Sequence, residues 1–389
     1  MRPPVEQEIH ELIRVHGRIT FAQLMHLCLY SRRGGFYASR RSGIGTHFGT
    51  ASLSHPVFGA LIARQLEQMW RLLGAPSLFH LIEVGCGDGA LAQSILHASG
   101  SAYPEFARAL YYVGADYAPH RLQSVGQGPD WQPAGKNFGT RSTHGLPTTF
   151  TRVSTSGLQA FRSIVGCILS NELLDNFPVH RFAVHRGRIM EVYVALSGDR
   201  FVESLGEPSS PRIAARLTEL GIVPSEGHRG EICLVIEDWV RELSAALERG
   251  FAMTIDYGDR SRALYAPRNA EGTLVCYHRH AALADPFQNI GRQDITCHVD
   301  FSALMEFGER NGLATAGYTR QSDFLRNLGF DGLLKTLQSQ GLSAARTELS
   351  RLAMMTLVEP EEYGDFKVLA QSKGLAPGVT LEGFLSPTP

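Results

Sequence analysis

The sequence carries almost no net charge and very little lysine. Its 37 Lys and Arg residues nearly balance its 38 Asp and Glu residues, which gives a formal net charge of -1, and only four of the basic residues are lysine. A chain without net charge creates no global field that would draw it to nucleic acid or to an anionic membrane. We therefore expect no nucleic acid and no membrane as partners, and we interpret the excess of arginine as a genomic bias.

Paired cysteines, a secretory leader and long apolar runs are also missing. The six cysteines are scattered without a C-x-x-C pair, which is typical of reduced core residues in a cytosolic protein. The first residues, "MRPPVEQEIHELIRVHGRIT", contain no apolar core of a signal peptide. No run approaches the roughly 20 apolar residues that a membrane-spanning helix needs. These absences predict a soluble, cytoplasmic protein.

Apolar strands alternate with helical segments through the middle of the chain. We expect strands in "FHLIEVG", "ALYYVGADY" and "IVGCILSNE", with a helix over 89–98 after the first of them. This alternation is typical of an α/β fold in which helices cover both faces of a doubly wound parallel sheet. Between that helix and the second strand, residues 99–110 are expected to form an extended loop.

The other segments predict additions around this α/β core. Hydrophobic spacing predicts a helix over 54–73, whereas Gly, Ser and Arg make 31–53 a long loop, and 258–299 is a second irregular segment. We divide the chain into an N-terminal helical and lid segment (1–75), a Rossmann-like core (76–205), an inserted substrate or dimerisation region with a returning core strand near 251–257 (206–322), and C-terminal helices with a closing core strand (323–389).

An acid and three alternating glycines follow the first predicted strand. The stretch "IEVGCGDG" places Glu83 two residues before Gly85, and Gly87 and Gly89 complete a G-x-G-x-G turn. Glycines let the backbone adopt positive φ and approach a ligand closely. A pyrophosphate is a poor ligand beside Glu83 because like charges repel, whereas a cationic amine is a good one. The turn alone is also compatible with any tight strand-to-helix connection.

A second acid ends the next predicted strand. Asp116 in "YYVGADY" can accept two hydrogen bonds from ribose hydroxyls. An acid for an amine, a glycine turn and an acid for a ribose together describe a site for S-adenosylmethionine (SAM) rather than for a dinucleotide. We therefore predict that this cofactor is bound by Glu83, Gly85, Gly87, Gly89 and Asp116.

A third polar cluster follows a later strand. In "CILSNELLDNFP", Asn171, Glu172 and Asp175 lie where doubly wound sheets place their ligands, at the carboxyl ends of strands. Asn171 could hydrogen-bond the donor or a substrate nitrogen, and the two carboxylates could hold a cation. We predict that all three are catalytic and that Asn171 also binds the cofactor. The alternative is that Asn171 caps a helix whose first turn carries the acids.

The second irregular segment is rich in cysteine and histidine, which invites a zinc site. The spacing of these residues fits none of the usual ligand patterns, so we expect no metal. Tyr257 follows the predicted strand "GFAMTID" and either borders the pocket or only ends that strand. The cysteine and histidine residues concerned are Cys276, His278, His280, Cys297 and His298.

These blocks resemble the MidA-like family of class I SAM-dependent methyltransferases, whose mitochondrial members are complex I assembly factors that methylate arginine on a partner subunit. The resemblance covers nearly the whole chain, in a family-specific order: "ITFAQLMHLCLYSRRGGFY", "IEVGCGDGALAQSIL", "NELLDNFPVHRF", "IDYG", "DITCHVDFSAL" and "GDFKVLAQS". It implies a seven-stranded methyltransferase core with an added helical and β region, and often a homodimer. It also implies that the acceptor is a protein arginine, with Asn171, Glu172 and Asp175 facing the site.

The first long loop departs from the family pattern. The family has a G-D-F-x-T-S-P-E-like run, whereas "GTHFGTASLSHPVFG" has His47 in place of the acid and Ser52-Leu53 in place of Pro-Glu. Loss of that Glu weakens the expected grip on a guanidinium, so the alternative is a small-molecule O- or N-methyltransferase with a histidine base. Weaker alternatives are a SAM-binding assembly factor without turnover and a nicotinamide dehydrogenase. We expect on the substrate side Phe48, Thr50, Tyr257 and His298.

Overall fold

The computed structural model describes residues 2–38, 51–116, 149–155, 157–279, 281–341 and 343–385. Packing divides the chain into two units. Unit 1 comprises Met1–Phe48, Leu174–Trp239 and Gly258–Phe307, and unit 2 comprises Gly49–Leu173, Val240–Tyr257 and Gly308–Pro389. Each unit therefore combines stretches of chain that are far apart in the sequence.

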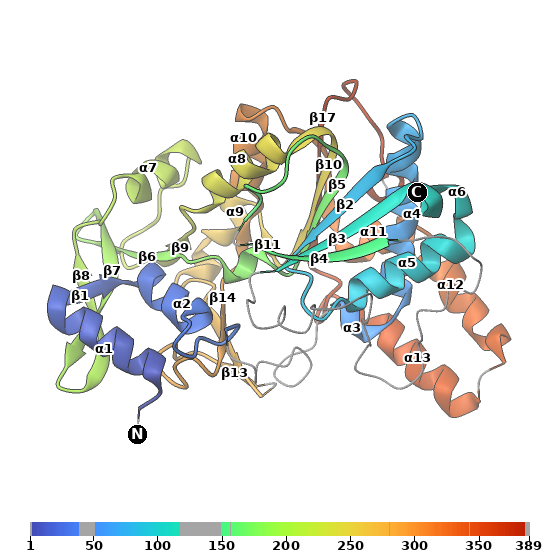
Figure 1. Ribbon diagram of the computed structural model, residues 1–389. Helices are drawn as coiled ribbons and strands as arrows, with labels where there is room; N and C mark the ends of the chain where they lie inside the picture. The colour runs from blue at the N-terminus through green and yellow to red at the C-terminus, as the bar shows by residue number, and fades with distance from the viewer. Residues whose placement is uncertain are drawn as a thin grey trace. The chain divides into compact units, whose positions relative to one another are not determined.

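A seven-stranded sheet forms the centre of unit 2 (Figure 1). From β10 to β4 neighbouring strands are parallel, whereas β17 runs antiparallel to both of its neighbours. Parallel strands covered on both faces need near-continuous apolar runs, which explains why they could be predicted. The expected α/β fold is confirmed. In spatial order the strands are β16 (Ala314–Arg320), β17 (Lys367–Lys373), β10 (Leu247–Asp256), β5 (Ile164–Asn171), β2 (Phe79–Val84), β3 (Leu110–Asp116) and β4 (Thr149–Ser154).

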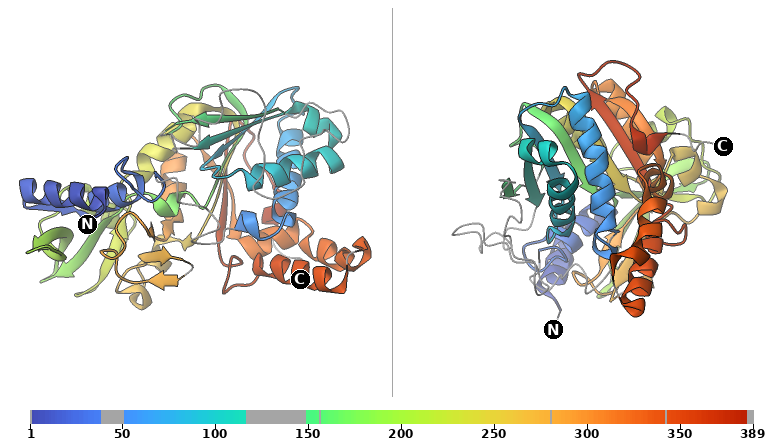
Figure 2. Two further views of the ribbon diagram at one scale, coloured as in Figure 1. Left: turned by 60° about the horizontal axis from the view of Figure 1, so that its bottom comes forward. Right: turned by 90° about the vertical axis from the view of Figure 1, so that its right-hand side faces the viewer.

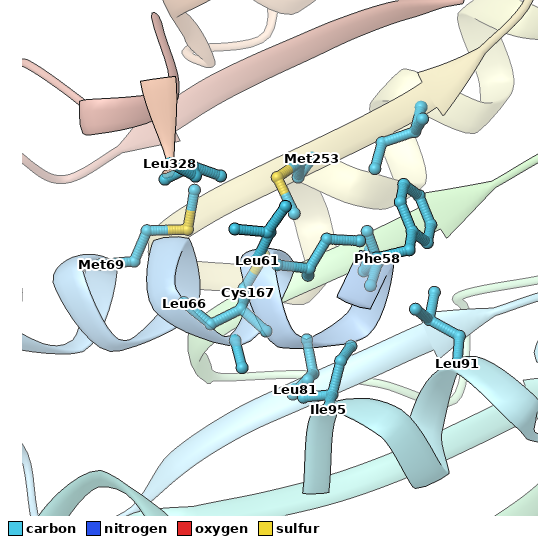
Figure 3. Close-up of a cluster of buried hydrophobic side chains, with 14 of the residues drawn as sticks. Phe58, Leu61, Leu66, Met69, Leu81, Leu91, Ile95, Cys167, Met253 and Leu328 are labelled. Carbon is cyan, nitrogen blue, oxygen red and sulfur yellow. The ribbon is translucent and has the colours of Figure 1, made fainter. Parts of the chain in front are cut away.

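The helix α4 (Val57–Leu72) lies lengthwise on this sheet, as the right-hand view of Figure 2 shows. Its apolar residues recur at helical spacing and face the core, where each large side chain contributes about 1.5–3 kcal/mol by burial. Figure 3 shows Phe58, Leu61, Leu66 and Met69 of α4 among Leu81 of β2, Cys167 of β5 and Met253 of β10. The other helical elements of unit 2 are α3 (Ala51–Ser54), α5 (Ala90–Ala102), α6 (Pro104–Ala109), α11 (Gln321–Asn327), α12 (Phe330–Thr336), η3 (Leu337–Gln340), α13 (Ala344–Thr356) and η4 (Glu382–Phe384).

The expectation of an extended loop over 99–110 is wrong. The helix α5 continues to Ala102, and α6 begins at Pro104 after a single intervening residue. Proline suits the first position of a helix because its missing N–H needs no partner there. Phe106 is fully buried and packs edge-on against Phe79, with ring centroids 5.4 Å apart. Burial of this aromatic side chain outweighs the weak helix propensity of the glycine and serines around it.

Unit 1 is built on smaller sheets. The largest has the order β1-β7-β6-β9, with β8 also paired to β7, and α1 and α2 lie beside it (Figure 1). The helix α2 begins with a capping box, in which Thr20 and Gln23 exchange side-chain and backbone hydrogen bonds. The strands are β1 (Arg18–Thr20), β6 (His180–His185), β7 (Arg188–Ser197), β8 (Arg200–Gly206), β9 (Arg229–Ile232), β11 (Gly258–Asp259), β12 (Val275–His278), β13 (Ala281–Leu283), β14 (Asp294–Thr296) and β15 (Val299–Asp300).

The helical elements of unit 1 are short, apart from α1. They are α1 (Pro4–His16), α2 (Phe21–Tyr30), η1 (Leu174–Asn176), α7 (Arg212–Glu219), α9 (Ser261–Leu264) and η2 (Pro267–Asn269). The chain passes between the units within α8 (Ile236–Ala246) and α10 (Phe301–Arg310). Among the described residues, no helix has both the length and the apolar character needed to cross a membrane. All six cysteines are free thiols, and all but Cys233 are buried.

Candidate active site

The glycine turn at the carboxyl end of β2 has the backbone that only glycine adopts without strain. Gly85, Gly87 and Gly89 have φ values of 78°, 51° and 87°, all in the left-handed region. A Cβ on Gly85 would meet Leu173 Cδ1 at 2.9 Å, so this position also lacks space for a side chain. Gly89 directly precedes α5. The turn therefore leaves its backbone free of side chains at the start of a helix, where a ligand can approach closely.

Hydrogen bonds tie the turn to the end of the neighbouring strand β3. The N–H of Gly85 donates to the carbonyl oxygen of Ala115 at 2.8 Å, and the N–H of Gly87 donates to Asp116 Oδ2 at 2.9 Å. The predicted amine-side turn and the predicted ribose acid are therefore adjacent in unit 2. Asp116 also orients the turn, which is a role that its place in the sequence does not suggest.

Glu83 is buried beneath this turn. Its side chain is 4% exposed, and Tyr112 donates its hydroxyl to Glu83 Oε2 at 2.7 Å. Burial raises the pKa of Glu83 to about 8, and the Tyr112 bond and the charge of Arg152 oppose this rise. Because a nearby cation favours the carboxylate form, a cationic amine bound here would lower this pKa towards its ordinary value.

Arg152 on β4 is a site-adjacent residue that sequence reasoning missed. Its Nη2 donates to the carbonyl oxygen of Gly87 and lies 3.9 Å from Cys86 Sγ. The backbone of Gly87 is thus held at two points, by Asp116 at its N–H and by Arg152 at its carbonyl. One feature of the sequence could have identified Arg152: it is a single arginine inside the strand "TFTRVS", and a charged side chain within a sheet needs a partner.

Asn171 and Glu172 lie at the carboxyl end of β5, in the same unit as the glycine turn. Glu172 Oε1 accepts hydrogen bonds from the N–H of Ala51 at 3.0 Å and from Asn171 Nδ2 at 3.1 Å. Asn171 Oδ1 is buried and has no hydrogen-bond partner among the described residues. A buried amide oxygen without a partner is costly, so this atom fits a ligand that donates a hydrogen bond.

The helix-cap alternative for Asn171 is wrong. Glu172 has φ of 49°, in the left-handed region, and the chain then forms the single 3-10 turn η1 rather than an α-helix. A non-glycine residue in this region is strained and is held by its surroundings. Here the N–H of Glu172 donates to the carbonyl oxygen of Ile255 at 2.9 Å, and the N–H of Leu173 donates to Asp256 Oδ2 at 3.1 Å. The end of β10 therefore holds the strained residue in place.

The remaining predicted residues are divided between the units. Asp175 belongs to unit 1, where it is 4% exposed and its backbone oxygen accepts a hydrogen bond from the N–H of Cys297 at 3.0 Å. His298 also belongs to unit 1 and is exposed. Tyr257 belongs to unit 2 and packs against Phe366, with ring centroids 5.3 Å apart. Outside the described residues lie Phe48, Thr50, His47 and His280.

The described part of the chain contains no group of three or more His, Cys, Asp or Glu residues that could hold a metal ion. Cys276 and Cys297 are buried, and burial raises the pKa of the Cys276 thiol to about 12. Both cysteines belong to the hydrophobic core of unit 1.

Comparisons with known proteins point to one class of enzyme. Residues 61–319 match the family described as "Putative S-adenosyl-L-methionine-dependent methyltransferase". "Protein arginine methyltransferase NDUFAF7 homolog, mitochondrial" of Drosophila melanogaster is 26% identical over 384 residues, which cover 92% of this chain and 82% of that protein. The human "Protein arginine methyltransferase NDUFAF7, mitochondrial" is 24% identical over 383 residues, which cover 93% of this chain and 81% of that protein.

A solved structure has the same fold. A Burkholderia thailandensis protein with bound S-adenosyl-homocysteine superposes with a TM-score of 0.80 at 29% sequence identity, covering 97% of this chain and 94% of that one. The edge of the sheet in unit 2 fits such a ligand. Its glycine turn exposes backbone at a helix start, and Asn171 Oδ1 is a buried acceptor without a partner among the described residues.

Proposed function

The chain belongs to the S-adenosyl-L-methionine-dependent methyltransferase family, and we propose that it transfers the methyl group of SAM to an arginine side chain of a protein. This family match confirms the resemblance predicted from the sequence motifs. It also confirms the predicted Rossmann-like fold, the enzyme class and the cofactor. What we propose beyond this is the methyl acceptor, a protein arginine. The observation that carries it is that relatives named protein arginine methyltransferases align with more than nine-tenths of this chain.

We assign donor binding to residues of unit 2 at the carboxyl edge of the sheet. When bound, SAM supplies an electrophilic methyl group on a positively charged sulfur. Asn171 Oδ1 would accept a hydrogen bond from the donor, Glu83 would balance the charge of its amine and Asp116 would bind its ribose hydroxyls. Gly85, Gly87 and Gly89 keep the backbone open to it. Because methyl transfer needs in-line alignment, the double anchoring of the Gly87 peptide supports a rigid donor position.

We assign acceptor binding to Glu172 of unit 2, and the predicted catalytic role of Asp175 stays a prediction. A guanidinium is protonated at neutral pH, so it needs carboxylates that orient it and that take up the proton it loses. Glu172 suits this task because its Oε1 is already oriented by the N–H of Ala51 and by Asn171. A pre-oriented carboxylate reduces the entropy lost when the acceptor is aligned.

Methyl labelling tests this proposal. The protein is incubated with methyl-labelled SAM and the total protein of a cell extract, and the hydrolysate is analysed for methylarginine by mass spectrometry. We expect label in methylarginine, and a loss of about 100-fold with Glu172→Gln, because an orienting group acts mainly through alignment. Glu248→Gln, at an exposed position of unit 2, is the matched control and should retain full activity. Label confined to small molecules would exclude the protein acceptor.

The second candidate is a small-molecule O- or N-methyltransferase, which the altered first loop favours. His47 and Ser52-Leu53 stand there in place of the family's acid and Pro-Glu pair. The same labelling experiment separates the two, because the label would then appear in the extract's metabolite fraction. Donor binding without any labelled product would instead support the SAM-binding assembly factor.

A homodimer, a cytoplasmic location and a substrate side formed by Phe48, Thr50, Tyr257 and His298 also stay proposals. The family resemblance supports the homodimer, and the scattered, unpaired cysteines support a reducing compartment. Sedimentation at several protein concentrations and cell fractionation test these two points. Alanine variants of the four residues should weaken acceptor use and leave donor binding intact.

A further inference from the structure

A cavity of about 30 Å³ lies within unit 1, whereas the proposed donor residues all belong to unit 2. Its walls come from α7, β9, α9 and β15, of which α7, β9 and α9 are labelled in Figure 1. A space of this size exceeds what one water molecule needs and accommodates the charged head group of a small ligand. The proposed function uses neither the arginine nor the acids that line this cavity.

The buried cation of the cavity is Arg216 of α7, which is 4% exposed. Its guanidinium carbon lies 3.8 Å from the centre of the Phe307 ring, and its Nη1 donates to Glu219 Oε2 at 3.4 Å. Stacking on a ring leaves the in-plane N–H groups of a guanidinium free to donate. Burial lowers the pKa of Arg216, and the charges of Glu219 and Asp300 oppose this fall. Arg216 therefore has donors for an acceptor that enters the cavity.

Asp300 of β15 lines the same cavity with a carboxylate. Ser261 Oγ donates to Asp300 Oδ1 at 2.7 Å, and the N–H of Ala303 donates to the same oxygen at 3.2 Å. A carboxylate offers about four acceptor positions, so Asp300 can accept a hydrogen bond from a further donor. Burial raises the pKa of Asp300, and the hydrogen bond from Ser261 and the charge of Arg216 oppose this rise. A cationic donor in the cavity would favour the carboxylate form further.

Arg216 and Asp300 influence each other but do not touch. Each opposes the pKa shift of the other, and yet among the described residues they form no ion pair. The other acid in the wall already has partners, because Glu231 Oε2 accepts from the N–H of Thr273 at 2.8 Å and Glu231 Oε1 lies 3.7 Å from Arg181 Nε. A buried charge needs a close partner, so two opposite charges that line one cavity without contact suit a ligand between them.

We propose that this cavity binds a small zwitterion, such as a free α-amino acid, with the ligand's carboxylate at Arg216 and its ammonium group at Asp300. A guanidinium recognises a carboxylate through two parallel hydrogen bonds, and a carboxylate accepts strong hydrogen bonds from an ammonium group. A ligand with a single charge would satisfy only one end of the cavity. This site goes beyond the proposed function and does not depend on it. Because the predicted substrate-side residue His298 also lines the cavity, ligand binding is measured directly and not through methyl transfer.

Calorimetry on the full chain tests the site with three probes: glycine, acetate and methylammonium. Glycine carries both charges, whereas acetate and methylammonium each carry one. We expect glycine to bind about tenfold more tightly than either of the others, because only glycine forms charge-assisted hydrogen bonds at both ends. Arg216→Met should weaken the binding of glycine and acetate about tenfold, and Asp300→Asn should weaken the binding of glycine and methylammonium by a similar factor.

Arg212→Met is the matched control. Arg212 lies on the same helix α7, but its side chain is exposed, is paired with Glu237 and does not line the cavity. This variant should bind all three probes as wild type does. Arg216→Lys keeps the charge and loses the planar fork, so it should weaken glycine binding less than Arg216→Met. Circular dichroism of each variant without ligand checks that a loss of binding is not a loss of folding.

Two results with the wild-type chain would overturn the proposal without any variant. If none of the three probes released or absorbed heat on binding, the cavity would hold only water. If acetate bound as tightly as glycine, the cavity would take a plain anion and the role of Asp300 would be wrong. Neither result affects the labelling of arginine, so the proposed function stands or fails separately.

Discussion

Glu83 in unit 2 and Asp294 in unit 1 are buried acids in similar settings with opposite neighbours. Each is at most 4% exposed and accepts a hydrogen bond from a tyrosine hydroxyl, at 2.7 Å from Tyr112 and at 3.0 Å from Tyr37. Burial raises the pKa of each to about 8. Beyond the tyrosine, however, the cation Arg152 has the largest charge effect on the pKa of Glu83, ahead of Asp116 and Asp88, whereas the acid Asp175 has the largest on that of Asp294.

The two regions therefore differ in how the charge of a buried acid is balanced. Unit 2 already contains a cation that compensates Glu83, so its turn can be rigid before the donor binds. In unit 1 the charge of Asp175 adds to burial in raising the pKa of Asp294, so this acid keeps its proton at neutral pH. The turns differ as well, because unit 2 shapes its turn with three left-handed glycines and unit 1 fixes η1 by side-chain hydrogen bonds.

The largest expected effect is on the pH dependence of stability. An acid whose pKa rises on folding stabilises the fold below its ordinary value near 4, and this contribution is lost as the pH rises towards 8. Each acid should therefore lower the free energy of unfolding by about 1 kcal/mol per pH unit between pH 5 and 8. Denaturant titrations should show that Glu83→Gln and Asp294→Asn each reduce the dependence of the free energy of unfolding on pH by about 1 kcal/mol per pH unit.

The exposed Glu248→Gln is the control for that slope and should leave it unchanged. A slope that is unaffected by both buried variants would contradict the view that these acids keep their protons on folding. A slope removed by only one of them would break the likeness between the two regions.

Removing the cation of unit 2 should have the next largest effect. Arg152→Met leaves the Gly87 carbonyl and Glu83 without their charged partner, which costs about 2 kcal/mol, or about a 30-fold loss of S-adenosyl-homocysteine affinity by calorimetry. Arg152→Lys keeps the charge and should lose less. Arg162→Met, at an exposed position of the same unit, should bind as wild type does. Equal affinities for all three variants would show that the cation does not prepare the donor site.

The glycine turn should be more sensitive to a side chain than an open left-handed glycine. Gly85→Ala combines a φ of 78° with a Cβ at 2.9 Å from Leu173, whereas Gly74→Ala has a φ of 84° and open space. We expect a loss of about 1 kcal/mol for Gly74→Ala from backbone strain and roughly another 1 kcal/mol for Gly85→Ala from the contact. Thermal unfolding measures both, and equal losses would mean that Leu173 moves aside.

The smallest predicted effect concerns the two tyrosines. Tyr112→Phe should lower the free energy of unfolding by about 1 kcal/mol, because it removes one buried hydrogen bond to Glu83. It should weaken donor binding and leave the extract concentration for half-maximal labelling unchanged. Tyr37→Phe removes a buried hydrogen bond to Asp294 and should lower the free energy of unfolding by a similar amount while leaving donor binding unchanged. Weaker donor binding in both variants would show that Tyr112 acts only through overall stability.

Local patterns in the sequence were enough for the core fold and for the candidate residues at strand ends. The parallel strands are continuous apolar runs, so their positions and the α/β fold were predictable. Glu83, the glycines, Asp116 and Asn171 could be chosen because carboxyl ends of parallel strands meet at one edge of a sheet. The loop expected over 99–110 was wrong, because the burial of Phe106 depends on Phe79, which lies elsewhere in the chain.

The sequence by itself determined the family, the sheet and the residues whose meaning lies in their immediate neighbours. Only the tertiary structure decided which groups surround the buried acids: Arg152 and Tyr112 near Glu83, and Tyr37, Asn176 and Asp175 near Asp294. Most of these partners are separated by tens to hundreds of residues along the chain. The protonation of a buried acid depends on distance in space, and no local pattern records that distance.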